Sequence, residues 1–69
     1  MKIDTLVGIN NYTLVIYAYP DGFYRFCIID STGIPYNFDS MFLTAEEANQ
    51  KGKDAVNLAY EFDLNEYQF

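Results

Sequence analysis

The chain has 69 residues, of which 51% are hydrophobic and 19% aromatic, and it carries a net charge of −6 at neutral pH. This composition is too apolar for a disordered chain, and the length predicts one small domain over residues 1–69. The acidic balance disfavours direct binding to nucleic acid or to an anionic membrane surface, and no apolar run is long enough to cross a membrane.

The cellular setting is predicted from what the sequence lacks. The single cysteine, Cys27, excludes an intrachain disulfide, and residues 1–4 do not resemble the start of a signal peptide. A cytoplasmic, reducing compartment is the simplest interpretation. A core this small cannot hide so much apolar surface, which favours a protein partner or a homodimer.

Two strands are predicted before residue 20. Residues 2–9 alternate, with Ile3, Thr5, Val7 and Ile9 on one side. A turn is expected at Asn10-Asn11, because asparagine tolerates positive φ angles. Residues 12–19 are rich in β-branched and aromatic side chains, which are typical of a strand.

Two glycine turns then set the pairing of three strands. Tyr19-Pro20-Asp21-Gly22 suits a type I turn followed by a left-handed glycine, which places Tyr17 opposite Arg25. The same geometry at Asp30-Ser31-Thr32-Gly33 places Ile28 opposite Tyr36, Phe26 opposite Phe38, and Arg25 opposite Asp39. Pro35 has no N–H to donate, so the third of these strands should lie at an edge.

Both turns predict the same two sheet faces. The uncharged face carries Leu14, Ile16, Ala18, Tyr24, Phe26, Ile28, Tyr36 and Phe38. The mixed face carries Thr13, Val15, Tyr17, Tyr19, Phe23, Arg25, Cys27, Asn37 and Asp39. We expect an ion pair between Arg25 and Asp39 on the mixed face.

One helix is predicted from about residue 45 to residue 60. Thr44 and Glu47 form a capping box at its start. One side of the helix carries almost only small residues, which are Ala45, Ala48, Gly52, Ala55, Val56 and Ala59. Gly52 costs about 1 kcal/mol relative to alanine, which a close approach to a large sheet side chain would offset. Residues 61–69 could continue the helix, form a strand or cover the mixed face.

The expected fold is therefore α+β, a three- or four-stranded antiparallel meander with one helix packed on one face. The segment GFYRFCIIDSTG at residues 22–33, followed by TAEEANQKG at residues 44–52, resembles the β-β-β-α module of YegP-type domains. The helix start also resembles that of HicB-type antitoxin domains. These resemblances imply the fold and assign no functional residue. YegP-type domains commonly occur in pairs, whereas the resemblance in this chain covers a single copy.

No catalytic, cofactor or metal site is predicted, so the chain is interpreted as a protein without enzymatic activity. Histidine, the commonest general base, is absent. Glu46 and Glu47 are adjacent on the predicted helix, so their side chains point in different directions and cannot share an acid–base site. The acidic tail lacks the central glycine of a calcium-binding loop, and residues 30–33 lack the sequence pattern of a phosphate-binding loop. Cys27 lies within a strand, and a catalytic role would require a pocket joining it to Arg25.

The mixed face is the candidate interaction surface, represented by Tyr17, Tyr19, Phe23, Arg25 and Asp39. Tyrosine, phenylalanine and arginine are enriched at protein interfaces, which favours a protein-binding module. Aromatic residues on a sheet can also stack nucleic-acid bases, but the charge of the chain disfavours this. The main alternative is an acidic regulator, antitoxin-like or a nucleic-acid mimic, that binds a basic site on a nucleic-acid-binding partner. It requires the carboxylates of Asp21, Asp30, Glu46, Asp54, Glu61 and Asp63 to gather on one surface.

Overall fold

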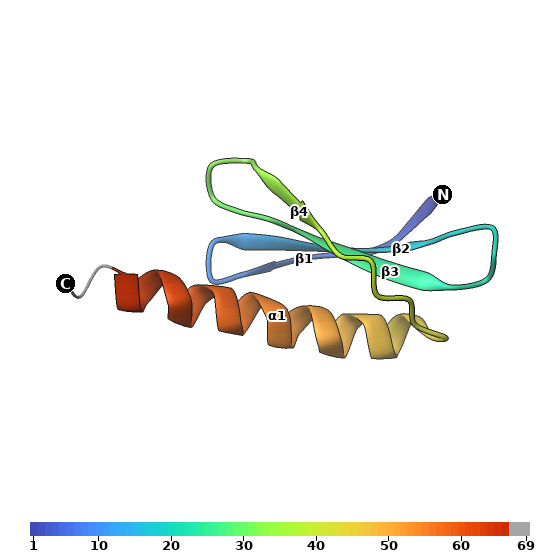
Figure 1. Cartoon of the computed structure of the whole chain (residues 1–69). Coiled ribbons are helices and arrows are strands. Elements are labelled where there is room, and N and C mark those ends of the chain that lie inside the picture. The colour runs from blue at the N-terminus through green and yellow to red at the C-terminus, as the bar shows by residue number, and fades with distance from the viewer. Residues whose placement is uncertain (67–69) are drawn as a thin grey trace.

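A computed structural model describes residues 1–66, with side chains described through residue 61. Its elements are β1 (Lys2–Ile9), β2 (Tyr12–Ala18), β3 (Tyr24–Ile29), β4 (Pro35–Asn37) and α1 (Ala45–Glu66). The strands form one antiparallel sheet in the order β1-β2-β3-β4, and α1 packs against one face of it (Figure 1). This arrangement confirms the predicted α+β fold in its four-stranded form.

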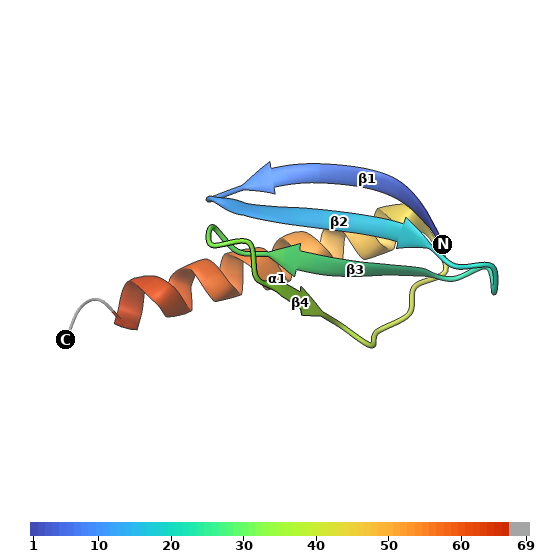
Figure 2. The same ribbon diagram turned by 90° about the horizontal axis from the view of Figure 1, so that it is seen from above.

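The core lies between α1 and the central strands β2 and β3. From above, α1 lies beneath these strands and continues past the end of the sheet (Figure 2). The buried cluster comprises Leu14, Ile16, Phe26 and Ile28 from the sheet and Ala48 and Val56 from the helix. The uncharged sheet face is therefore the one that the helix covers, as its composition predicts.

The turns have the predicted backbone conformations. Asn10 and Asn11 have φ angles of 50° and 70°, as a two-residue type I′ hairpin requires. Gly22 and Gly33 have φ angles of 88° and 90°, which place them in the left-handed region. The Gly22 N–H donates to the Tyr19 carbonyl at 3.0 Å.

The strand registers also agree with the turn-based predictions. Tyr17 lies opposite Arg25, and Ile28 lies opposite Tyr36. Pro35 begins the edge strand β4.

A β-bulge in β1 overturns the predicted alternation of the first strand. Ile3 pairs with Tyr17, but the next pair along the ladder joins Thr5 to Ile16. Asp4 is therefore an extra residue, and it shifts Ile3 to the opposite face from Thr5. The predicted grouping of Ile3 with Thr5, Val7 and Ile9 is wrong for this residue, which joins the mixed face beside Tyr17.

The short β4 corrects a second prediction. Its ladder with β3 ends at Asn37, and Tyr24 is bridged instead by Phe42 through two backbone hydrogen bonds of 2.8 Å. Phe38 still contacts Phe26, with ring centroids 4.7 Å apart. The strand ends before it could place Asp39 opposite Arg25.

The helix begins as predicted and extends further. The Glu47 N–H donates to the Thr44 hydroxyl at 3.1 Å. A Cβ atom added to Gly52 would lie 2.5 Å from Leu14 Cδ1, so the absent side chain allows the expected close approach. The helix continues beyond the predicted residue 60 to Glu66. Residues 61–69 are expected to continue the helix, form a strand or cover the mixed face; they continue the helix as far as Glu66. Residues 67–69 lie outside the described part of the chain.

Hydrogen bonds to Asp30 close the turn before β4. Its Oδ1 accepts from the Thr32 hydroxyl at 2.6 Å and the Ile34 N–H at 3.0 Å, and its Oδ2 accepts from the Tyr36 hydroxyl at 3.2 Å. These hydrogen bonds lower the pKa of Asp30 below its ordinary value of 3.8, and the bond from the Thr32 hydroxyl contributes most. A carboxyl group with a lowered pKa in the folded state stabilises the fold at any pH above its pKa in the unfolded chain. This stabilisation is lost as the pH falls through the pKa of the folded state.

Replacement of Asp30 by asparagine is therefore expected to remove part of the acid sensitivity of the fold. The wild type should lose stability between about pH 4.5 and 2, and Asp30→Asn should show a shallower loss from a lower starting stability. Urea unfolding at a series of pH values measures both slopes. Glu46→Gln alters an exposed carboxylate in the first turn of α1, at the opposite end of β3 from Asp30, and serves as the matched control that should keep the wild-type slope. Equal slopes for wild type and Asp30→Asn would contradict the assignment.

Candidate interaction surface

The sheet face opposite α1 is hollowed and open. No helix or strand of the described residues covers it (Figure 1). A hollow of about 650 Å³ lies on this face. Its lining residues are Met1, Ile3, Val15, Tyr17, Tyr19, Arg25, Cys27, Asn37, Phe38 and Asp39. We call this set the open-face hollow.

Buried side chains form the floor of the open-face hollow. Val15 and Tyr17 are each 8% exposed, although no second layer of the described chain covers them. The Tyr17 and Tyr19 rings lie 5.5 Å apart and tilted by 42°. Burial, followed by the neighbouring Tyr19, raises the pKa of Tyr17, so its phenol is neutral at physiological pH. The floor is a closely packed aromatic surface with a hydroxyl group.

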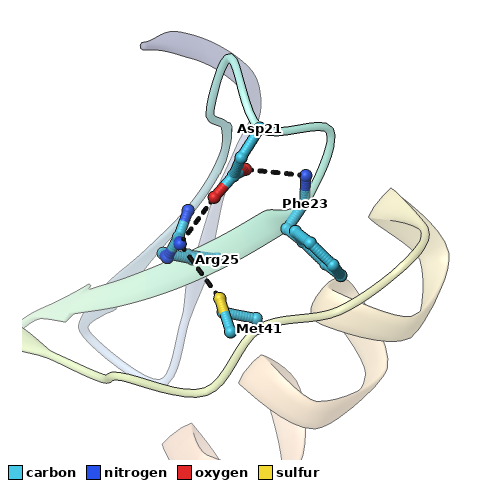
Figure 3. Close-up of polar contacts among 4 residues, drawn as sticks. All are labelled: Asp21, Phe23, Arg25 and Met41. Carbon is cyan, nitrogen blue, oxygen red and sulfur yellow. Dashed lines mark hydrogen bonds and ion pairs between the residues drawn. The ribbon is translucent and has the colours of Figure 1, made fainter.

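Arg25 is held by a network of contacts at the edge of this floor (Figure 3). Its Nη2 lies 3.0 Å from Asp21 Oδ2 and 3.1 Å from Met41 Sδ, and its guanidinium carbon lies 3.9 Å from the centre of the Tyr19 ring. The side chain is only 15% exposed. Its Nη1 is buried without a hydrogen-bond partner in the described structure. Arg25 is therefore fixed in place by charge, stacking and burial together.

The predicted ion pair between Arg25 and Asp39 is wrong, since the partner of Arg25 is Asp21. Asp21 lies in the turn four residues earlier, where its Oδ1 also accepts from the Phe23 N–H at 2.9 Å. The Phe23 N–H, followed by Arg25, lowers the pKa of Asp21. The turn therefore offers a carboxylate that is already oriented, whereas Asp39 lies beyond the end of β4.

Four of the five predicted surface residues share the open-face hollow. Tyr17, Tyr19, Arg25 and Asp39 line it, and Phe23 does not. The Phe23 side chain points away from the Arg25 guanidinium in Figure 3. Phe23 precedes the first residue of β3, so the alternation of that strand does not extend to it.

Sequence reasoning missed the contribution of the N-terminal strand to this face. Ile3 is 58% exposed, and it lines the open-face hollow because the bulge at Asp4 moves it there. Leu6 pairs with Val15, so it lies on the same face, and it is 63% exposed. A bulge has no clear mark in a single sequence, so only the structure locates Ile3.

The hollow brings Cys27 and Arg25 to one surface, which is the arrangement that a catalytic cysteine would require. However, burial raises the pKa of the Cys27 thiol, and the Arg25 guanidinium is paired with Asp21. A nucleophilic cysteine needs the opposite shift, toward the thiolate. Among the described residues, no group of three or more histidine, cysteine, aspartate or glutamate side chains could hold a metal ion.

The carboxylates are distributed over several elements. Asp21 and Asp30 lie in turns at opposite ends of β3, where both accept hydrogen bonds from their own turns. Glu46, Asp54 and Glu61 lie on α1, together with Lys51 and Lys53, and the Asp63 side chain lies outside the described part. The five described carboxylates of this set therefore lie in two turns and on one helix, and the acidic-regulator alternative stays a prediction.

Comparison with known proteins adds no relative. No family model matches the chain, and neither the curated proteins nor the solved structures include a match. The resemblance to YegP-type and HicB-type domains therefore stays a prediction. Within the described residues, no helix is both long and apolar enough to cross a membrane.

Proposed function

We propose that this chain is a small, acidic, non-enzymatic module that binds another protein through the open-face hollow. The observation that carries the proposal is a hollow whose floor is Val15 and Tyr17, each 8% exposed, and whose rim carries the exposed apolar residues Met1 and Ile3. One helix can cover only one face of a sheet, so this face is available to a partner.

The chemistry of the hollow suits a protein surface. Tyr17, Tyr19 and Arg25 combine apolar area with polar groups, and such residues dominate the binding energy of protein interfaces. Arg25 is held by Asp21 and Tyr19, so little conformational entropy is lost when a partner contacts it. Met1 and Ile3 add an exposed apolar rim.

A protein partner fits the local charge better than a nucleic acid does. The positive charge of Arg25 is paired with Asp21, and Asp39 adds a negative charge to the lining. Binding to phosphates depends on an excess of cationic side chains, whereas this chain carries −6 overall. The aromatic residues are therefore better suited to protein side chains than to nucleic-acid bases.

Photo-crosslinking in the native cell tests this proposal. A benzophenone amino acid in place of Ile3 lies beside the open-face hollow, and the same amino acid in place of Gln50 lies on the exposed side of α1. We expect a protein adduct of one defined mass from position 3 and none from position 50. Asn37→Arg should abolish the adduct, because it places a long charged side chain at an exposed lining position.

The stability of each variant is the necessary control. All three substituted positions are exposed, so the unfolding midpoints should stay close to that of the wild type. Equal crosslinking from positions 3 and 50, or an adduct that persists in the folded Asn37→Arg variant, would contradict the proposal.

A further inference from the structure

The two edges of the sheet differ in their capacity to pair with another strand. At one edge, β4 has three residues and begins with Pro35. At the other edge, β1 has eight residues and contains no proline. No other described element lies along the outer side of β1 (Figure 2). A long uncovered edge strand presents unpaired backbone groups that another strand can bind.

The register of the first hairpin identifies these outward backbone groups. The two-residue turn closes on the pair Ile9 and Tyr12, which exchanges its backbone hydrogen bonds within the hairpin. Residues alternate along an edge strand between inward and outward bonding. Leu6 and Gly8 therefore direct their N–H and C=O groups away from β2.

We infer that β1 pairs antiparallel with β1 of a second copy of this chain, over residues 5–9, about a two-fold axis at Val7. Leu6 of each copy then lies opposite Gly8 of the other, and each such pair exchanges two backbone hydrogen bonds. The sheets of the two copies join into one continuous sheet.

Side-chain volume supports the register centred on Val7. Leu6 is 63% exposed, and no atom lies within 4 Å of a Cβ added to Gly8. Leu6 and Gly8 lie on the same sheet face, so the exposed leucine of one copy packs over the bare backbone of the other. A register centred on Leu6 would place the bulged Asp4 in the ladder, whereas the Val7 register ends before it.

Charge also favours this edge as the contact between two acidic chains. Residues 2–9 contain one positive residue, Lys2, and one negative residue, Asp4, so they sum to zero, against −6 for the whole chain. The paired segment 5–9 contains no charged side chain. Two copies can therefore approach along β1 without bringing their carboxylates together.

Two substitutions at Gly8 test the inference. Gly8→Pro removes the outward N–H, whereas Gly8→Ala keeps it, and both fit the hairpin because Gly8 is not among the positive-φ residues and its Cβ position is empty. We expect the wild type to dimerise in sedimentation equilibrium at micromolar concentrations. Gly8→Pro should raise the dissociation constant roughly 10- to 100-fold, whereas Gly8→Ala, which adds only a methyl group beside Leu6 of the other copy, should change it much less.

Amide hydrogen exchange of the wild type provides a second readout that does not depend on any variant. Protection of the Leu6 and Gly8 amides should rise with protein concentration, while Val7, which bonds toward β2, should keep constant protection. A chain that stays monomeric, a dimer that a folded Gly8→Pro variant leaves intact, or concentration-independent exchange at Leu6 and Gly8 would overturn the inference. In the open-face crosslinking experiment, an adduct with the mass of two copies of the chain would come from this dimer, and only an adduct of another mass would come from the partner under the proposed function.

Discussion

Replacement of Gly52 by valine is expected to destabilise the fold by about 2–3 kcal/mol. Leu14 is fully buried, and its Cδ1, Cδ2 and Cγ would lie 2.5, 3.0 and 3.3 Å from a Cβ at position 52. A valine adds further atoms where even the Cβ has no room, so α1 must lift or Leu14 must adopt a strained rotamer. Equilibrium urea unfolding measures the loss.

The matched control is Lys53→Val. It introduces the same β-branched side chain one residue along the helix, at an exposed position. We expect its stability to stay within about 0.5 kcal/mol of the wild type. If the two valine variants lost similar stability, contact with Leu14 would not be the cause, because valine has a higher helix propensity than the glycine that it replaces.

Truncation of Leu14 to alanine is expected to cost about 3 kcal/mol, because it leaves a cavity beneath α1. At roughly 0.05–0.15 kcal/mol per residue, a 69-residue chain has a total stability of about 3–10 kcal/mol. This single substitution therefore removes a large fraction of it. Thermal unfolding followed by circular dichroism should show a strongly lowered midpoint.

The effect of Gly52→Ala on the free energy of unfolding is expected to depend on the side chain at position 14. In the wild type, Gly52→Ala gains about 1 kcal/mol of helix propensity but forces its Cβ against Leu14, so it should be neutral or destabilising. In the Leu14→Ala background that Cβ occupies the cavity, and the same substitution should be stabilising. Additive effects in this double-mutant cycle would show that residues 14 and 52 do not contact each other.

Local chemistry explains why most of the sheet could be predicted. Gly22 and Gly33 have the positive φ angles that their turn sequences require, and each turn sets the register of the strands that it joins. The Thr44 cap and the small residues near Gly52 act in the same local way, through one hydrogen bond and one close contact. These features depend on a few neighbouring residues, so they are visible in one sequence.

The candidate site was less predictable, because its geometry depends on irregularities in the sheet. The bulge at Asp4 adds Ile3 to the open-face hollow, and the end of β4 at Asn37 separates Asp39 from Arg25. Met41 reaches Arg25 from the segment before α1, and no periodicity indicates this contact. Such features depend on where strand pairing ends and on how the connecting segments pack against the complete sheet.

The sequence by itself determined the two hairpin registers, the start of the helix and the sheet face that the helix covers. Each follows from turn chemistry, capping or side-chain size, which act within a few residues or across one pair of strands. Only the tertiary structure decided that Arg25 pairs with Asp21, that Ile3 lies beside Tyr17, and that β1 is the exposed long edge. These depend on where strands end or bulge, which is set by the packing of the complete sheet.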